Sequence, residues 1–150
     1  MVCVALLPYA GAQRCPPAQG CRLCGGTVPR ILIADDSAGM RRYLRRVIES
    51  IPGCWICGEA VDGVEAVNKT RELVPDLIIL DLSMPRMNGL DVAHVLRTSG
   101  IQIPIILFTL HASVISSSQV SAVGIDAVVP KIADEASLVS QVERLLAVAS

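Results

Sequence analysis

Five polar side chains stand at the ends of strongly apolar segments, and their types suit the handling of a phosphate group. They are two adjacent carboxylates, a third carboxylate, a hydroxyl and an ammonium: Asp35, Asp36, Asp81, Thr109 and Lys131. Carboxylates that crowd together repel each other and need a cation to stay ionised at neutral pH. Magnesium, which takes oxygen ligands and leaves room for water and phosphate oxygens, fits such a cluster best.

These residues could form a site for phosphoryl transfer. Such catalysis depends mostly on positioning and on neutralising charge, and an aspartate can accept the phosphoryl group covalently. Lys131 would supply a compact positive charge for an anionic substrate, and Thr109 a neutral donor. The alternative for each aspartate is capping of the next helix, and Thr109 alone would be an ordinary strand-end residue. The combination of all five favours the site.

Strands must position these residues, and apolar runs predict five of them after Arg30. The third run, LIILDL, is apolar throughout except for Asp81, as in strands from the middle of a parallel sheet. The fourth ends in Thr109. The predicted strands cover residues 31–35, 55–60, 77–82, 103–109 and 127–129.

Helical periodicity predicts one helix after each strand. Ser37 can cap the first helix, and Pro75 follows the end of the second. The predicted helices run from Ser37 to about residue 50, over 63–73, from 89 to about 99, over about 114–123, and over 135–148.

Five strands alternating with five helices through short connections predict an α/β fold, an open doubly wound parallel sheet with helices on both faces. In such a sheet, ligands bind outside the carboxyl ends of the strands, where the strand order reverses. The five polar residues stand at or just after those ends. The fold prediction therefore brings them to one edge of the sheet.

Several motifs resemble, in order and spacing, the receiver domain of bacterial response regulators, the chemotaxis-regulator-like partners of histidine kinases. They are ILIADDS, EAVDGVEAV, PDLIILDLSMPRMNGL, PIILFT and the region of Lys131. The resemblance implies a flavodoxin-like sheet of strand order 2-1-3-4-5, with residues 30–150 as one receiver domain. It also implies a phosphoacceptor switch of a two-component phosphorelay. The donor would be a sensor histidine kinase or a phosphotransfer protein, and a downstream effector protein could respond. Such a domain catalyses only its own phosphorylation and dephosphorylation.

The resemblance assigns the metal and acceptor residues one by one. Asp81 resembles the phosphoacceptor. Asp36 resembles the carboxylate that binds Mg²⁺ directly, and Asp35 the one that acts through water. The backbone carbonyl of Ser83 would be a further metal ligand.

Three positions near the switch residues depart from the family pattern. Thr109 resembles the switch hydroxyl and Lys131 the ion-pairing lysine. Leu110 replaces a small residue and would crowd access to the acceptor, and Val128 stands where an aromatic residue is usual. Ile132 replaces a proline, which puts the customary cis peptide bond in doubt. These departures favour the alternative function, a phosphorylation-independent protein-interaction domain on the same fold.

Composition and charge limit the partners. Apolar residues make up 52% of the chain and charged residues 18%. Beyond residue 30 the chain has 10 basic and 14 acidic residues, so charge gives no case for direct nucleic-acid binding. Four arginines of the first predicted helix are interpreted as a solvated face, with kinase docking as the alternative. They are Arg41, Arg42, Arg45 and Arg46.

Residues 1–29 are rich in proline and glycine and show no persistent period, which predicts a disordered N-terminal tail. Four of the six cysteines lie there, but neither a disulfide framework nor a zinc site is favoured. Cys54 and Cys57 are interpreted as a loop thiol and a core residue. No apolar run approaches the roughly 20 residues of a membrane span, and no secretory signal is convincing. A cytoplasmic location without a membrane is therefore expected.

Overall fold

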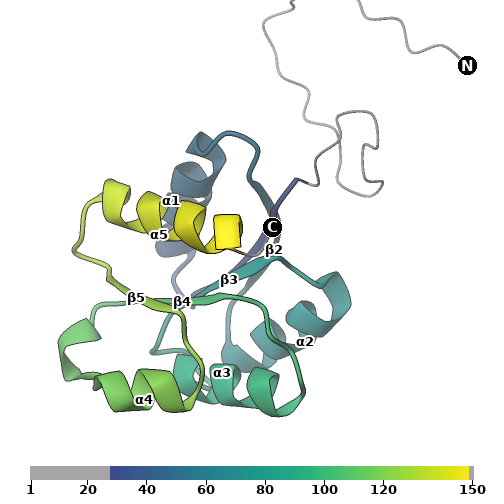
Figure 1. Ribbon diagram of the computed structural model, residues 1–150, viewed down its shortest axis with the longest axis vertical. Coiled ribbons are helices and arrows are strands. Elements are labelled where there is room, and N and C mark those ends of the chain that lie inside the picture. The colour runs from purple at the N-terminus through teal and green to yellow at the C-terminus, as the bar shows by residue number, and fades with distance from the viewer. Residues whose placement is uncertain (1–27, 149–150) are drawn as a thin grey trace, which may run out of the picture.

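The structure, a computed structural model, describes residues 28–148, so nearly all of the predicted N-terminal tail lies outside the described residues. Five parallel strands form one sheet in the order β2-β1-β3-β4-β5, which confirms the predicted fold (Figure 1). The strands are β1 (Arg30–Ala34), β2 (Trp55–Ala60), β3 (Leu77–Leu80), β4 (Ile105–Thr109) and β5 (Ala127–Pro130).

Helices cover both faces of the sheet (Figure 1). One face carries α1 (Ala38–Ser50) and α5 (Glu135–Val148), and the other carries α2 (Gly63–Leu73), α3 (Gly89–Thr98) and α4 (Ser117–Ala122). A single 3-10 turn, η1 (Ala112–Val114), precedes α4. The doubly wound arrangement therefore follows the prediction.

The strands contribute to two hydrophobic cores, one on each face. In β1, Ile31 and Ile33 pack with α1 and α5, whereas Leu32 and Ala34 pack with α2 and α3. Successive side chains of a strand point to opposite faces. Because helices cover both faces of the sheet, the side chains that point to either face are apolar. This explains the continuous apolar runs in the sequence.

Strand β2 contains a bulge. Ile31 pairs with Ile56 and Leu32 pairs with Gly58, so Cys57 is an extra residue opposite β1. Beyond the bulge, Ala60 packs in the α2–α3 core. A bulge of this kind shifts the alternation of side chains along the strand, which decides the face on which Glu59 lies.

The predicted cap of α1 is confirmed. The Ser37 side chain accepts a hydrogen bond from the Met40 N–H, at 3.3 Å. Helices α2 and α3 are capped in the same way by Asp62 and Asn88. Each cap satisfies a backbone N–H that has no partner within its helix.

The predicted helix over residues 114–123 is wrong in its first half. Ser116 has extended backbone angles, φ −77° and ψ 151°, and forms a capping box with Gln119, so α4 begins only at Ser117. An N-cap residue is non-helical by definition, which separates α4 from η1. The Ser-x-x-Gln spacing was a visible signal of this boundary.

Strand β4 starts two residues later than predicted. Pro104 has no N–H to donate to a neighbouring strand. The carbonyl of Ile103 instead accepts a hydrogen bond from the Arg97 guanidinium, at 2.9 Å. The other strand and helix boundaries agree with the prediction to within two residues.

Candidate functional site

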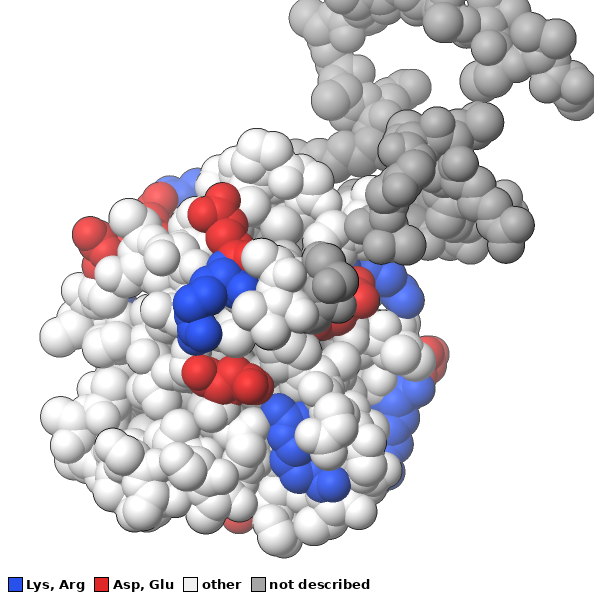
Figure 2. All heavy atoms as spheres, in the orientation of Figure 1, with Lys and Arg blue, Asp and Glu red and all other residues white. Residues whose placement is uncertain are grey.

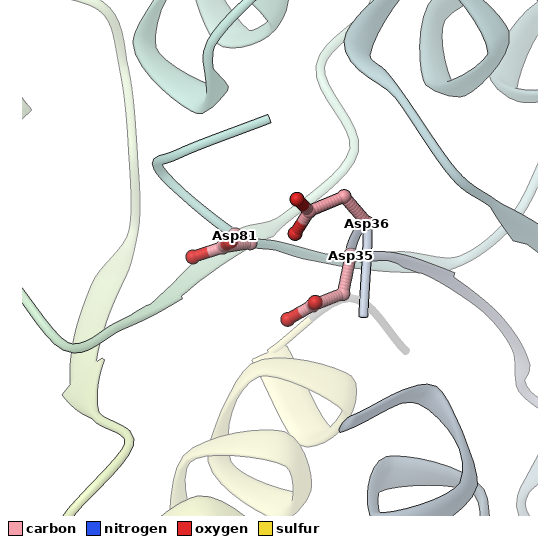
Figure 3. A group of neighbouring side chains, drawn as sticks. All are labelled: Asp35, Asp36 and Asp81. Carbon is pink, nitrogen blue, oxygen red and sulfur yellow. The ribbon is translucent and has the colours of Figure 1, made fainter. Parts of the chain in front are cut away.

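Three carboxylates meet at the carboxyl edge of the sheet. Asp35 and Asp36 follow β1, Asp81 follows the neighbouring strand β3, and the three side chains point to the same side (Figure 3). One carboxylate oxygen of each residue lies within 4.8 Å of the others. Asp35 and Asp81 are buried, whereas Asp36 is exposed. The structure thus brings together the three aspartates that the sequence predicted.

Backbone hydrogen bonds fix the two buried aspartates. The Asp35 N–H donates to the Ala60 carbonyl at 3.1 Å, and the Asp81 N–H donates to the Ala34 carbonyl at 2.8 Å. The Ser37 N–H donates to the Asp35 carboxylate at 2.8 Å. Both aspartates therefore continue the inter-strand hydrogen bonding by one residue, and their side chains start from rigid positions.

Lys131 joins the two buried carboxylates. Its Nζ lies 2.5 Å from Asp35 Oδ2 and 3.3 Å from Asp81 Oδ1, and its side chain is 8% exposed. The Lys131 N–H donates to the carbonyl of Thr109 at 2.9 Å, which ties the end of β5 to the end of β4. The predicted lysine is therefore part of the site.

Burial raises the pKa of the Asp81 carboxyl above its usual value. The Lys131 ammonium opposes this shift, while the nearby Asp35 carboxylate adds to it. Among residues 28–148, Lys131 is the only cation that pairs with the carboxylates of Asp35 and Asp81. A site with three carboxylates and one ammonium suits a hard divalent cation such as Mg²⁺, which prefers oxygen ligands.

Thr109 and Ser83 lie at the same edge with different contacts. Thr109 is fully buried at the end of β4, and its hydroxyl oxygen accepts the His111 N–H at 3.0 Å. Within residues 28–148 this hydroxyl makes no hydrogen bond to the three carboxylates. Ser83 is exposed, and a hydrogen bond from its backbone slightly opposes the rise that burial causes in the pKa of Asp81.

The three departures lie around β4 and β5. Leu110 is 65% exposed and Ile132 is 88% exposed, whereas Val128 is half-buried against the α2–α3 core. No peptide bond within the described chain is cis, and that includes the bond after Lys131. The expected crowding of the acceptor by Leu110 stays a prediction.

The loop after Asp81 is fastened to the start of α2. The Arg86 guanidinium lies 3.0 Å from the Asp62 carboxylate. A Cβ on Gly63 would collide with the carbonyl carbon and Cβ of Met87, so only glycine fits there. The two loops beside the aspartates are thus held together.

Sequence reasoning missed one part of the site's support. The Arg41 guanidinium donates to the Asp35 carbonyl at 2.8 Å and to the Glu59 carboxylate at 3.0 Å. Arg45 also pairs with Glu59, at 2.5 Å. With a side chain only 15% exposed, Arg41 is not on a solvated face, so that interpretation was wrong for it. No signal in the sequence marked Glu59 as its partner, because the bulge decides where Glu59 points.

A family model for the response regulator receiver domain matches residues 31–143. With the fold and the acidic edge described above, the chain belongs to this family, the receiver domains of two-component response regulators, and it is a signalling domain.

Its curated relatives include the protein-glutamate methylesterase/protein-glutamine glutaminase of Pyrococcus abyssi, 44% identical over 53% of this chain and 22% of the relative. The protein of the same description from Nocardioides is 31% identical over 77% of this chain and 32% of the relative. The chain thus spans about a fifth to a third of the length of these two relatives.

Solved structures give the same result. The response regulator domain of Thermotoga maritima CheB has a TM-score of 0.72 at 27% identity, covering 79% of this chain and 96% of that chain. A LuxR-family response regulator from Aurantimonas has a TM-score of 0.75 at 32% identity, covering 81% of this chain and 86% of that chain. Within residues 28–148, no helix is long and apolar enough to span a bilayer.

Proposed function

We propose that Asp81 accepts a phosphoryl group from a sensor histidine kinase or a phosphotransfer protein. The P–N bond of the donor phosphohistidine breaks as a P–O bond to the Asp81 carboxylate forms, and the electron pair of the broken bond stays on the imidazole nitrogen. The domain then returns to its starting state by hydrolysis. It acts as a switch and catalyses only its own phosphorylation and dephosphorylation.

The position of Lys131 is the observation that carries this proposal. Its ammonium lies 3.3 Å from Asp81 Oδ1 and is held by Asp35. A positive charge beside the acceptor oxygen stabilises the charge that develops on a transferring phosphoryl group. A lysine that only stabilised the fold would not need to contact a second, buried carboxylate beside its own partner.

The acidic edge would hold a magnesium ion. Asp36 would bind the ion directly, Asp35 through water, and Asp81 with the Ser83 carbonyl would complete the protein ligands. When bound, magnesium supplies further neutralisation of phosphoryl charge. Asp35 already accepts from Lys131 and Ser37, which supports the indirect role for it, and Asp36 is exposed and available.

Thr109 would act after the transfer. Its hydroxyl, now engaged with the His111 N–H, would turn toward the phosphoryl oxygens and bias the segment that follows β4. A downstream effector protein would recognise the changed surface. A cytoplasmic location remains part of this proposal, and the free thiols of Cys54 and Cys57 are compatible with it.

Incubation with acetyl phosphate and magnesium, followed by intact mass measurement, tests the acceptor. The wild-type chain should gain one phosphoryl group, and Asp81→Asn should gain none. Asp91→Asn, an exposed aspartate on α3, is the matched control and should be phosphorylated like wild type. Label that persists in Asp81→Asn, or that maps to Ser83, would exclude the assignment.

Calorimetry tests the metal ligands. Asp36→Ala should weaken magnesium binding far more than Asp35→Ala, since only Asp36 is proposed to bind directly. The single tryptophan is a poor reporter because Trp55 begins β2, at the opposite edge of the sheet from the aspartates. Equal losses of affinity in the two variants would contradict the proposed roles.

A phosphorylation-independent interaction domain is the second candidate. Leu110 and Ile132 are exposed apolar side chains beside the site, and Val128 provides no aromatic ring to rearrange. Amide chemical shifts over residues 109–131, with and without beryllofluoride as a phosphoryl mimic, separate the two candidates. Shifts that spread through α4 and β5 support the switch, and shifts confined to the acidic edge support the second candidate.

A further inference from the structure

We propose that Phe108 is a positioning residue that holds the Lys131 ammonium between Asp35 and Asp81. This inference rests on the phosphoryl transfer proposed above and adds to it an aromatic support for the lysine. Lys131 Nζ lies over the Phe108 ring, 6.0 Å from the ring centroid, and Tyr43 lies parallel to that ring at 6.4 Å between centroids and 7° between planes.

A lysine needs such support because its ammonium is a point charge on four flexible methylenes. Asp35 and Asp81 attract the ammonium from one side of the site, but a point charge has no preferred direction between two acceptors. The face of an aromatic ring carries partial negative charge and attracts a cation that lies over it. The ring of Phe108 therefore adds a third attraction, which restricts Lys131 Nζ to positions that also contact Asp81.

The ring itself is held firmly. Phe108 is 2% exposed in the core under α1 and α5, and it directly precedes the buried Thr109 in β4. Tyr43 of α1 packs against the same core. The Arg46 guanidinium lies over the Tyr43 ring, 5.5 Å from the centroid of that ring. Arg46 also pairs with Glu135 at 2.9 Å, which joins the first turn of α5 to α1. The two rings thus connect the site lysine to the outer surface of α1 and α5.

The simpler explanation is that Phe108 only fills the core. Both explanations predict that a smaller residue lowers stability, so stability cannot separate them. Only the positioning role predicts that loss of the ring changes the environment of the Lys131 side chain and slows phosphorylation without removing the metal site.

The composition of the chain makes this measurement direct. Phe108 is the only phenylalanine, and Lys131 and Lys69 are the only lysines. Lysine labelled with ¹³C at the ε carbon therefore gives two NMR signals. Lys69 pairs with Glu65 at 2.6 Å on α2, and within residues 28–148 no aromatic ring lies over it, so its signal is the internal control.

The first experiment compares wild type with Phe108→Leu, which keeps an apolar side chain but removes the ring. Protons that lie over an aromatic face resonate upfield. In wild type, the protons on the labelled ε carbon of Lys131 should therefore resonate upfield of those of Lys69. In Phe108→Leu the two signals should converge, and the rate of phosphorylation by acetyl phosphate should fall about five- to tenfold. Magnesium affinity, which depends on the three carboxylates, should change little.

Tyr43 provides a second pair of variants at a half-buried position, where folding is less at risk. Tyr43→Phe keeps the stacked ring and should leave the Lys131 signal and the rate unchanged. Tyr43→Leu should shift the Lys131 signal part of the way toward Lys69 and slow phosphorylation by a smaller factor than Phe108→Leu.

The outcomes also separate this inference from the proposed function. If wild type is phosphorylated and Phe108→Leu keeps both the rate and the Lys131 signal, the positioning role is wrong. If Phe108→Leu does not fold, equal rates and equal Lys131 signals in Tyr43→Leu and Tyr43→Phe overturn it. If wild type takes no phosphoryl group from acetyl phosphate, the proposed function fails, and the Lys131 signal alone decides whether Phe108 holds the lysine.

Discussion

The loops on the α2–α3 side of the sheet are fastened to each other, whereas the segment around α4 is attached to the sheet by few buried side chains. On the α2–α3 side, Asp62 both caps α2 and pairs with Arg86, and Gly63 lies against the backbone of Met87. Both α2 and α3 contribute fully buried side chains to the core. Movement of one loop on this side would disturb the other.

The α4 side is built differently. Helix α4 has six residues, none of them buried, and it is capped by Ser116 and Gln119 rather than by a neighbouring element. The chain carries no Asp, Glu, Lys or Arg from residue 109 to residue 125, and Figure 2 shows an uncharged surface over α4. The segment therefore has no charged side chains of its own to form ion pairs. It is held by half-buried side chains such as Val120 and Val123 and by hydrogen bonds from the Arg97 guanidinium to the Gly124 carbonyl.

The site lies at the boundary between the two sides. Asp81 directly follows β3 and begins the loop that is fastened to α2, whereas Thr109 ends β4 and Lys131 directly follows β5. Lightly attached elements are the ones that can reorganise at low cost. We therefore expect a change at Asp81 to alter the positions of α4 and β5, while the α2–α3 side keeps its structure.

The largest expected effect is from Gly63→Ala. The added Cβ would meet the Met87 backbone, which cannot move without disturbing the Asp81 loop, and we expect a loss of about 3 kcal/mol in unfolding free energy. Gly39→Ala in α1 is the control, because its Cβ would have room and alanine favours a helix by about 0.5–1 kcal/mol. Urea unfolding of both variants makes the measurement. Equal stability of the two would show that the α2–α3 loops are not closely fitted.

Amide hydrogen exchange should distinguish the two sides within one molecule. Amides of α3 should exchange only on global unfolding, whereas those of α4 should exchange through local opening, faster by about 10² or more if the difference in opening free energy is about 3 kcal/mol. Comparable protection in α3 and α4 would remove the proposed distinction.

A smaller effect is expected from Asp62→Asn, which keeps a capping side chain but loses the charge. The hydrogen bond from the Glu65 N–H and the nearby Arg86 guanidinium hold the pKa of Asp62 below its usual range. Its charge therefore stabilises the fold fully above the unfolded pKa of about 3.9, and this contribution is lost as the pH falls through the lower folded pKa. In thermal unfolding, the Tm of wild type should be higher than that of the variant at pH 7, and the two Tm values should be equal at the lowest pH. A difference that does not depend on pH would assign the effect to the cap alone.

Leu110→Ala tests access to the acceptor from the α4 side. If Leu110 screens the acceptor, its removal should speed phosphorylation by acetyl phosphate and shorten the lifetime of the phosphorylated form, each about fivefold for roughly 1 kcal/mol of barrier. Since the side chain is 65% exposed, stability should hardly change. Unchanged rates would show that Leu110 does not control access.

The smallest effect is expected at the far end of α2. Val74 has a φ of 48°, a left-handed conformation that a β-branched residue adopts only at a cost. Val74→Asn should raise the unfolding free energy by about 0.5–1 kcal/mol, because the side chain is 67% exposed and little apolar contact is lost. Val61→Asn, at an exposed valine with ordinary backbone angles, should give no such gain in urea unfolding. A loss of stability in Val74→Asn would show that the valine packs better than its exposure indicates.

Local signals in the sequence predicted most of this structure. The buried strands were visible because both of their faces are covered, and Ser37 was recognised from its own residue type. The capping box that shortens α4 is equally local, but the serine-rich segment has too weak an apolar period to show where the helix starts. Arg41 was misassigned because its partner Glu59 belongs to another element. Ion pairs between elements depend on packing that no periodicity within one element contains.

The extra residue in β2 has a consequence for the length of the chain. Cys57 and Gly58 both lie on the α2 side of the sheet, so the strand uses two residues where regular alternation would use one. Removing Cys57 would leave Ile56, Glu59 and Ala60 on the faces they now occupy, with the Arg41 and Arg45 pairs intact. The bulge is thus a position where the chain can lose a single residue without turning the side chains that follow to the opposite face of the sheet. Among homologous sequences, a one-residue gap at this point would keep the following side chains on their present faces, whereas the same gap in β1 or β3 would move the residues beyond it to the opposite face.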